Sequence, residues 1–150
     1  MSATVQTVTL AREAAPAAKA GKTGPLIDAY AVAASVIGAA PPSMRAMAGT
    51  RIIVEGEPGT SMFVIRTGKV ELTIQDRLVD VLNPGDPLGE MAMIDSDARS
   101  ATATAMVDCD LLQVDRPLFE AMIRAEPTFA IHVMRAMVKR MRRMQMTMQA

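Results

Sequence analysis

The sequence has few of the residues that build disulfide frameworks and metal sites. Among its 150 residues there is one cysteine, Cys109, and one histidine, His132. A single cysteine leaves no disulfide within the chain and no cysteine-based zinc site, and a single histidine provides no histidine cluster for a metal ion. Tryptophan is absent and aromatic residues make up 3% of the chain, whereas methionine occurs 14 times. This composition predicts an aliphatic, methionine-containing core and no bound metal.

The chain also has no hydrophobic run long enough to span a membrane. Its longest apolar stretch, residues 26–40, is shorter than the ~20 residues that a membrane-spanning helix needs. A secretion leader is the alternative, because Lys19 and Lys22 precede the stretch. Such a leader would be long, and Pro41 would follow its cleavage site. We therefore expect a short packed helix and a cytoplasmic protein.

Charge of neither sign prevails overall, but it is unevenly distributed. Residues 1–50 carry a net charge of +2, residues 51–126 carry −7, and residues 127–150 carry +5 with no acidic residue. The total of zero gives no indication of nucleic-acid or membrane binding. The sequence instead describes an acidic body followed by a basic end.

The pattern of turns and apolar segments divides the chain into three parts. Residues 1–25 are rich in alanine and small polar residues and keep no period, which predicts a flexible tail. Residues 26–42 are expected to hold an N-terminal helix, and residues 43–150 the main domain. Within 43–115, turn residues separate the segments RIIV (51–54), MFVIR (62–66), VELTI (70–74), LVDVL (78–82), TATAMV (102–107) and LLQVD (111–115). Short, partly alternating segments at this spacing predict an antiparallel sandwich or barrel.

The C-terminal part, residues 116–148, has a helical pattern. Pro117 opens one helix and Pro127 a longer one that continues to about Gln145. Apolar residues of the longer helix recur at the spacing of a coiled-coil seam, and they are Ile131, Met134, Val138, Met141 and Met148, with Gln145 at the remaining position. Five basic residues lie on the same helix, namely Arg135, Lys139, Arg140, Arg142 and Arg143. They allow three interpretations, which are a solvated face, a lid over a ligand, and a surface for an acidic partner or a membrane.

The stretch 85–104 has the residues of an anion-binding and hydroxyl-binding site. Gly89 lets the backbone turn and approach a ligand closely, and residues 90–94 can form one helical turn whose N–H groups point at an anion. Arg99 offers a charged fork to a phosphate and Ser100 adds a hydroxyl donor. Glu90 is unsuited to a phosphate but suited to a sugar hydroxyl. A ribose phosphate satisfies both requirements.

These residues resemble a known family. Gly89-Glu90-Met91-Ala92 followed by Arg99-Ser100-Ala101-Thr102 is similar to the phosphate-binding cassette of cyclic nucleotide-binding domains, which occur in catabolite-activator-type regulators, protein-kinase regulatory subunits and nucleotide-gated channels. The resemblance covers residues 43–145, roughly two-thirds of the chain, and includes the turns at Gly49-Thr50, Glu55–Gly59, Gly68-Lys69 and Asn83–Asp86. It implies an antiparallel β-roll of jelly-roll type (a double-stranded β-helix) with N- and C-terminal helices.

The resemblance also implies a role for individual residues. Arg99 and Ser100 would bind the cyclic phosphate, Glu90 would accept from the ribose 2′-hydroxyl, and backbone groups would come from Gly89, Met91 and Ala92. The base would be flanked by Val64, Val79 and Leu88, and covered by the long C-terminal helix through Arg135, Met144 or Gln145. The plainer alternatives are an ion pair of Arg99 with Glu90 or Asp95 and a strand hydroxyl at Ser100.

The chain departs from the family pattern in two respects. Asp97-Ala98 stands where many members have Gly-Pro, so the loop before Arg99 is expected to be less rigid, and Asp95 and Asp97 bring negative charge toward the phosphate site. The sequence to Ala150 has no helix-turn-helix, so we expect no DNA-binding domain.

Our hypothesis is a non-enzymatic regulatory module that binds a cyclic nucleotide reversibly, with cAMP favoured over cGMP and no other cofactor. No nucleophile–base pair or metal constellation is evident for catalysis. Binding would fold the C-terminal helix back onto the acidic roll, because a symmetric helix pair would bring like charges together, and an effector protein would receive the signal. The alternative is a degenerate pocket in a protein-interaction or dimerisation module that uses the methionine seam.

Overall fold

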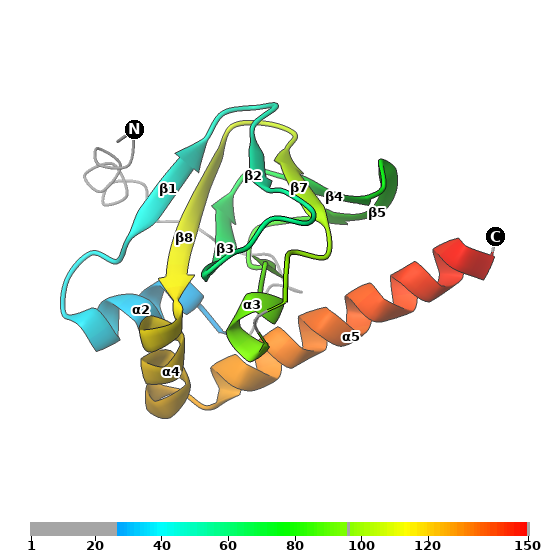
Figure 1. The fold of residues 1–150 in the computed structure, drawn as a ribbon. Coiled ribbons are helices and arrows are strands. Elements are labelled where there is room, and N and C mark those ends of the chain that lie inside the picture. Colours follow the sequence, from blue (N-terminus) through cyan, green and yellow to red (C-terminus); the bar gives the residue numbers. More distant parts are fainter. Residues whose placement is uncertain (1–26, 96, 150) are drawn as a thin grey trace.

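The computed structural model describes residues 27–95 and 97–149, so the predicted tail at 1–25 lies outside the described residues. Two four-stranded antiparallel sheets face each other, with helices against one side (Figure 1). One sheet has the order β1 (Ser43–Ala46), β8 (Cys109–Asp115), β3 (Ser61–Thr67) and β6 (Pro87–Leu88). The other has the order β2 (Arg51–Ile53), β7 (Thr102–Ala105), β4 (Val70–Ile74) and β5 (Arg77–Leu82). The predicted antiparallel roll is confirmed.

Two of these strands, β1 and β6, were not predicted from the sequence. The β1 segment Ser-Met-Arg-Ala has no β-branched or aromatic residue, and β6 has only two residues. Both become strands through pairing with a partner, β1 with β8 and β6 with β3. Their strand conformation therefore depends on tertiary hydrogen bonds rather than on local propensity.

The helices are α2 (Ala29–Ile37), the single turn α3 (Met91–Ile94), α4 (Arg116–Ala125) and α5 (Thr128–Gln149). The Asp28 carboxylate accepts a hydrogen bond from the Ala31 N–H, and Asp115 accepts one from the Leu118 N–H at 3.0 Å. Such side chains satisfy N–H groups that a first helical turn leaves free. No helix among the described residues is long and apolar enough to cross a membrane.

The core consists of two clusters that meet at β3. One lies between the sheets and includes Phe63, Ile65 and Leu88, and the other lies between the β1–β8–β3–β6 sheet and the helices and includes Met62 and Val64. Because successive strand residues point to opposite faces, β3 contributes to both clusters and residues 61–65 are all buried. A strand buried on both faces loses the alternation of polar and apolar residues.

Helix α5 packs on the body of the molecule with one face. Phe129 and Val133 are buried in the helix-facing cluster and Met137 packs partly against it. Figure 1 shows α5 running from α4 past α3 toward the side of β5, and α5 and β5 are in contact. The predicted seam is a different face, since Ile131 and Met134 are 43% and 51% exposed.

Candidate ligand-binding site

Arg99 lies in the segment between α3 and β7. There it contacts the loop between β2 and β3 and the turn before α3. Its Nη2 donates to the Ser61 carbonyl oxygen at 2.7 Å and its Nη1 to the Gly89 carbonyl oxygen at 3.2 Å. Its backbone is fixed as well, because the Arg99 N–H donates to the Glu57 carbonyl and the Gly56 N–H donates to the Arg99 carbonyl, both at 2.9 Å. The sequence predicted a less rigid loop before Arg99, but these two backbone hydrogen bonds fix the position of the residue.

The side chain of Arg99 has N–H donors left over for an anion. A guanidinium has five N–H donors, and the two bonds to main-chain carbonyls use two of them. Burial lowers the pKa of Arg99, and the negative charge of Glu90 opposes this shift. The group remains positively charged, because arginine does not lose its proton in proteins. The cassette therefore presents a fixed, partly desolvated positive charge.

Two glycines make room for this guanidinium. A Cβ added at Gly59 would overlap the Arg99 guanidinium, and one added at Gly89 would lie 2.8 Å from Arg99 Nη1 and from Ile53 Cδ1. Gly89 also has φ of +75°, a conformation that residues with side chains rarely adopt. The sequence analysis assigned Gly59 to a turn, whereas the structure places it directly beside the arginine.

Glu90 follows Gly89 and is buried, with 3% of the residue exposed. Its Oε2 accepts a hydrogen bond from Arg140 Nη1 of α5 at 2.7 Å, and its Oε1 has no partner among the described residues. A buried carboxylate oxygen without a donor is costly. The open side of Glu90 is thus a strong acceptor for a hydroxyl donor.

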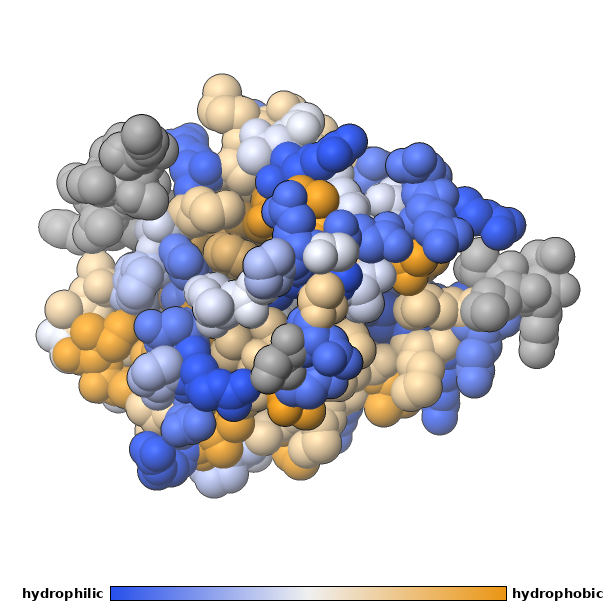
Figure 2. Space-filling model, in the orientation of Figure 1, coloured by the Kyte–Doolittle hydropathy of each residue, from blue (hydrophilic) through white to orange (hydrophobic). Residues whose placement is uncertain are grey.

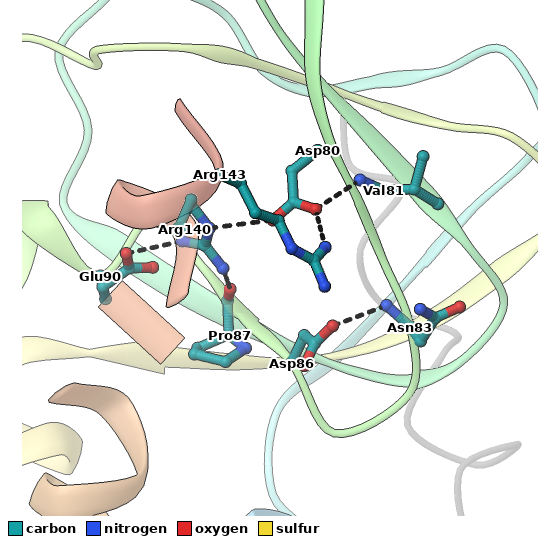
Figure 3. Close-up of polar contacts among 8 residues, drawn as sticks. All are labelled: Asp80, Val81, Asn83, Asp86, Pro87, Glu90, Arg140 and Arg143. Atoms are coloured by element: carbon teal, nitrogen blue, oxygen red, sulfur yellow. Dashed lines mark hydrogen bonds and ion pairs between the residues drawn. The ribbon is translucent and has the colours of Figure 1, made fainter. Parts of the chain in front are cut away.

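Arg140 joins α5 to the strands and loop beside the cassette (Figure 3). Besides Glu90, it donates from Nη2 to the Pro87 carbonyl at 2.7 Å, and its Nε lies 3.9 Å from Asp80 Oδ2. Arg143, one helical turn further on, pairs with Asp80 Oδ1. The two arginines and the two carboxylates, Asp80 and Glu90, form one network, which we call the α5 clamp.

A fifth polar contact lies nearer the start of α5, where His132 Nε2 is 2.9 Å from the Gly85 carbonyl oxygen. The α5 clamp was not predicted from the sequence, although the spacing of residues on α5 indicates it. Arg140 follows Phe129, Val133 and Met137 at helical spacing, so a charged residue lies on the face that packs against the body. A charge on such a face requires a partner.

The remaining cassette residues lie at the rim. Ser100 is exposed and its hydroxyl contacts Met91 Sδ at 3.5 Å, while the Ala92 N–H donates back to the Gly89 carbonyl at 3.2 Å. Asp95 and Asp97 are both exposed. The Asp95 carboxylate accepts a hydrogen bond from the Asp97 N–H at 3.2 Å, and solvent screens both charges.

The structure brings together only some of the residues expected around the base. Leu88 is buried in the cluster between the sheets and Val79 packs against that cluster. Val64 belongs to the other cluster, which faces the helices, so its position gives no support to the prediction that it flanks the base. Arg135 and Gln145 are exposed, and the α5 residue that contacts the cassette is Arg140 rather than either of these.

The family of the chain follows from this fold and from a direct comparison. The cyclic nucleotide-binding domain family model matches residues 44–126. The chain belongs to this family. Among the residues that the structure describes, no group of three or more potential metal ligands occurs.

Several curated proteins and solved structures are similar to part of the chain. The cyclic AMP receptor protein of Thermus thermophilus is 33% identical over 99 residues, which cover 63% of this chain and 46% of that protein. A cGMP-dependent protein kinase of Caenorhabditis elegans is 35% identical over 77 residues, covering 51% of this chain and 10% of the kinase. The crystal structure of the Thermus thermophilus catabolite activator protein superposes with a TM-score of 0.65 at 28% identity, covering 81% of this chain and 57% of that one. The chain spans less than half the length of these curated relatives.

Proposed function

We propose that the protein binds a cyclic nucleotide reversibly, with cAMP favoured over cGMP, and that α5 transmits the bound state to an effector protein. The observation that carries the proposal is that two complementary groups, Arg99 and Glu90, both lie next to Gly89. Arg99 presents a fixed positive charge for the cyclic phosphate, and Glu90 presents a buried oxygen, Oε1, without a partner. A phosphate and a ribose hydroxyl supply the charge and the donor that these two groups need. The long match to a cyclic AMP receptor protein supports the choice of cAMP.

The two oxygens of Glu90 give α5 a direct connection to the ligand. Oε2 is bound to Arg140, and Oε1 would accept from the ribose 2′-hydroxyl. The helix and the ligand would then share one carboxylate without competing for the same atom. A ligand that holds Glu90 in place favours the α5 clamp, and by linkage a formed clamp favours the ligand to the same extent. Movement of α5 onto the roll, with the α5 clamp formed, is the signal that we propose for the ligand-bound state.

Calorimetric titration with cAMP, cGMP and 2′-deoxy-cAMP tests the binding and the role of Glu90. We expect cAMP to bind most tightly. A hydrogen bond to a charged group contributes about 1.5–3 kcal/mol, so the 2′-deoxy analogue is expected to bind roughly 10- to 150-fold more weakly. Equal affinity for cAMP and its 2′-deoxy analogue would remove Glu90 from the ribose site. No heat with any of the three nucleotides would favour the degenerate interaction module instead.

Gly59→Ala is expected to weaken cAMP binding while the protein stays folded. The added methyl group displaces the Arg99 guanidinium, which is the flexible end of a side chain, and the φ angle of Gly59 is not in the left-handed region. We expect a loss of about 10- to 100-fold in affinity, equivalent to roughly 1.4–2.7 kcal/mol. The measurement is the same titration, together with the thermal midpoint. Thr60→Ala, a change at the exposed neighbour, is the control and should leave both values unchanged.

A further inference from the structure

The sulfur atom of Met91 contacts one of the two side chains that bind the phosphate in the proposed function. The Ser100 hydroxyl donates a hydrogen bond to Met91 Sδ, with 3.5 Å between the oxygen and the sulfur. Met91 is the first residue of α3 and follows Glu90 directly. Among the residues that the structure describes, no other methionine sulfur accepts a hydrogen bond. The chemical state of this one sulfur therefore bears directly on the phosphate site.

Met91 is also open to solvent. The residue is 48% exposed, and Ile94 of the same helical turn is 60% exposed. Figure 2 shows apolar side chains among polar ones on the face of the molecule on which α3 lies in Figure 1. The core methionines differ, since Met62 and Met93 are 0% and 3% exposed. A dissolved oxidant therefore reaches Met91, whereas packing excludes it from the core.

We propose that Met91 is an oxidation site, and that its conversion to methionine sulfoxide by a peroxide weakens the binding of the cyclic nucleotide. The sulfur lone pair attacks one oxygen of hydrogen peroxide, so an S–O bond forms and the O–O bond breaks. The other oxygen leaves as hydroxide and takes the proton from the newly bound oxygen to give water. The sulfur loses two electrons and the peroxide gains them. Methionine sulfoxide reductases reverse this oxidation. The inference rests on the proposed function, because it concerns the same site.

The sulfoxide competes with the phosphate for the Ser100 hydroxyl. A thioether sulfur is a weak acceptor, so Ser100 gives up its bond to Met91 at little cost when a phosphate approaches. Oxidation makes the side chain polar, and the sulfoxide oxygen, with its partial negative charge, is a stronger acceptor. Ser100 has a single O–H donor, and a donor held by the sulfoxide is lost to the phosphate. The added oxygen also repels the negative charge of the ligand.

The other sulfur atoms of the chain do not share this position. Cys109 is 1% exposed, and burial raises the pKa of its thiol. Because the thiolate is the reactive form of cysteine, both its location and its ionisation protect Cys109 from the oxidant. Met47, in the loop between β1 and β2, is 61% exposed and is open to oxidation, but its sulfur has no hydrogen bond to the cassette. Met47 therefore provides a matched control.

Calorimetric titration with cAMP before and after treatment with hydrogen peroxide tests the inference, and peptide mass mapping shows which methionines have gained an oxygen. We expect oxidised wild type to bind roughly 3- to 10-fold more weakly, which corresponds to the loss of one neutral hydrogen bond. Each variant is compared with its own untreated form. Met91→Leu should keep its affinity on treatment, because leucine has a similar volume and no sulfur. Met47→Leu should lose affinity as the wild type does.

Ser100→Ala separates the proposed route from general oxidative damage. Without the hydroxyl the sulfoxide has no donor to withhold, so peroxide should lower the affinity of this variant less than that of the wild type. Methionine sulfoxide reductases for both sulfoxide epimers should restore the affinity of the oxidised wild type. Unchanged affinity of wild type oxidised at Met91, or an equal loss in Met91→Leu or Ser100→Ala, would overturn the inference alone. An untreated wild type that binds no cAMP would overturn the proposed function and, with it, the effect of oxidation.

Discussion

Replacing Arg99 with alanine is expected to abolish most of the cAMP binding while the roll stays folded. Arg99 is the partly desolvated positive charge of the cassette, and its two bonds to the Ser61 and Gly89 carbonyls set its direction. Loss of one partner from a desolvated, hydrogen-bonded charge pair costs roughly 2–5 kcal/mol, which is about 30- to several-thousand-fold in affinity. Calorimetric titration of the variant with cAMP measures this loss, and far-ultraviolet circular dichroism checks the fold.

Two companion variants sharpen this result. Ser100→Ala should cost less, roughly 0.5–1.5 kcal/mol, because a neutral donor makes a weaker bond than a guanidinium. Arg135→Ala removes an exposed arginine of α5 that has no place in the cassette, and it should leave the affinity unchanged. Unchanged affinity in Arg99→Ala itself would disprove the assignment of the cassette as the phosphate site.

Replacing Arg140 with methionine is expected to destabilise the protein and to release α5. The side chains of Arg140 and Glu90 are 11% and 4% exposed, so the variant leaves a buried carboxylate without its cation. Breaking a buried pair from one side costs about 3–5 kcal/mol. Chemical denaturation measures the loss, and amide exchange across residues 130–145 is expected to become faster. In the wild type, cAMP should slow the same exchange.

Arg143→Met is the matched control for this prediction. It removes an arginine of the same clamp whose side chain is 53% exposed. Its partner Asp80 is buried but keeps Arg140 Nε at 3.9 Å and the hydrogen bond from the Val81 N–H, so we expect a smaller loss of stability than in Arg140→Met. Adding Glu90→Gln to Arg140→Met should recover part of the lost stability, because a neutral amide is cheaper to bury than a charge. Exchange of α5 that is equally slow in wild type and Arg140→Met would show that the clamp does not hold the helix.

The candidate site divides into a part that is local in sequence and a part that is not. Gly89, Glu90, Arg99 and Ser100 lie within twelve residues of one another, and a short loop can bring them together whatever surrounds it. Their chemistry could therefore be interpreted from residue types and spacing. Asp80 and Arg140 are separated by sixty residues, and nothing in either segment alone identifies the other. Only the docking of α5 beside β5 and the cassette makes them partners.

The sequence by itself determined the antiparallel roll, the helices that follow it and the cassette, because turn residues, alternation and helical spacing act over short distances. Tertiary structure decided three further points. It turned β1 and β6 into strands by pairing them, it placed Val64 in the cluster that faces the helices, and it chose which face of α5 meets the roll. The apolar period of α5 allows two faces, and the choice between them depends on the surface opposite. Phe129 and Val133 fill the helix-facing core, Arg140 finds two carboxylates, and the seam is left on the outside.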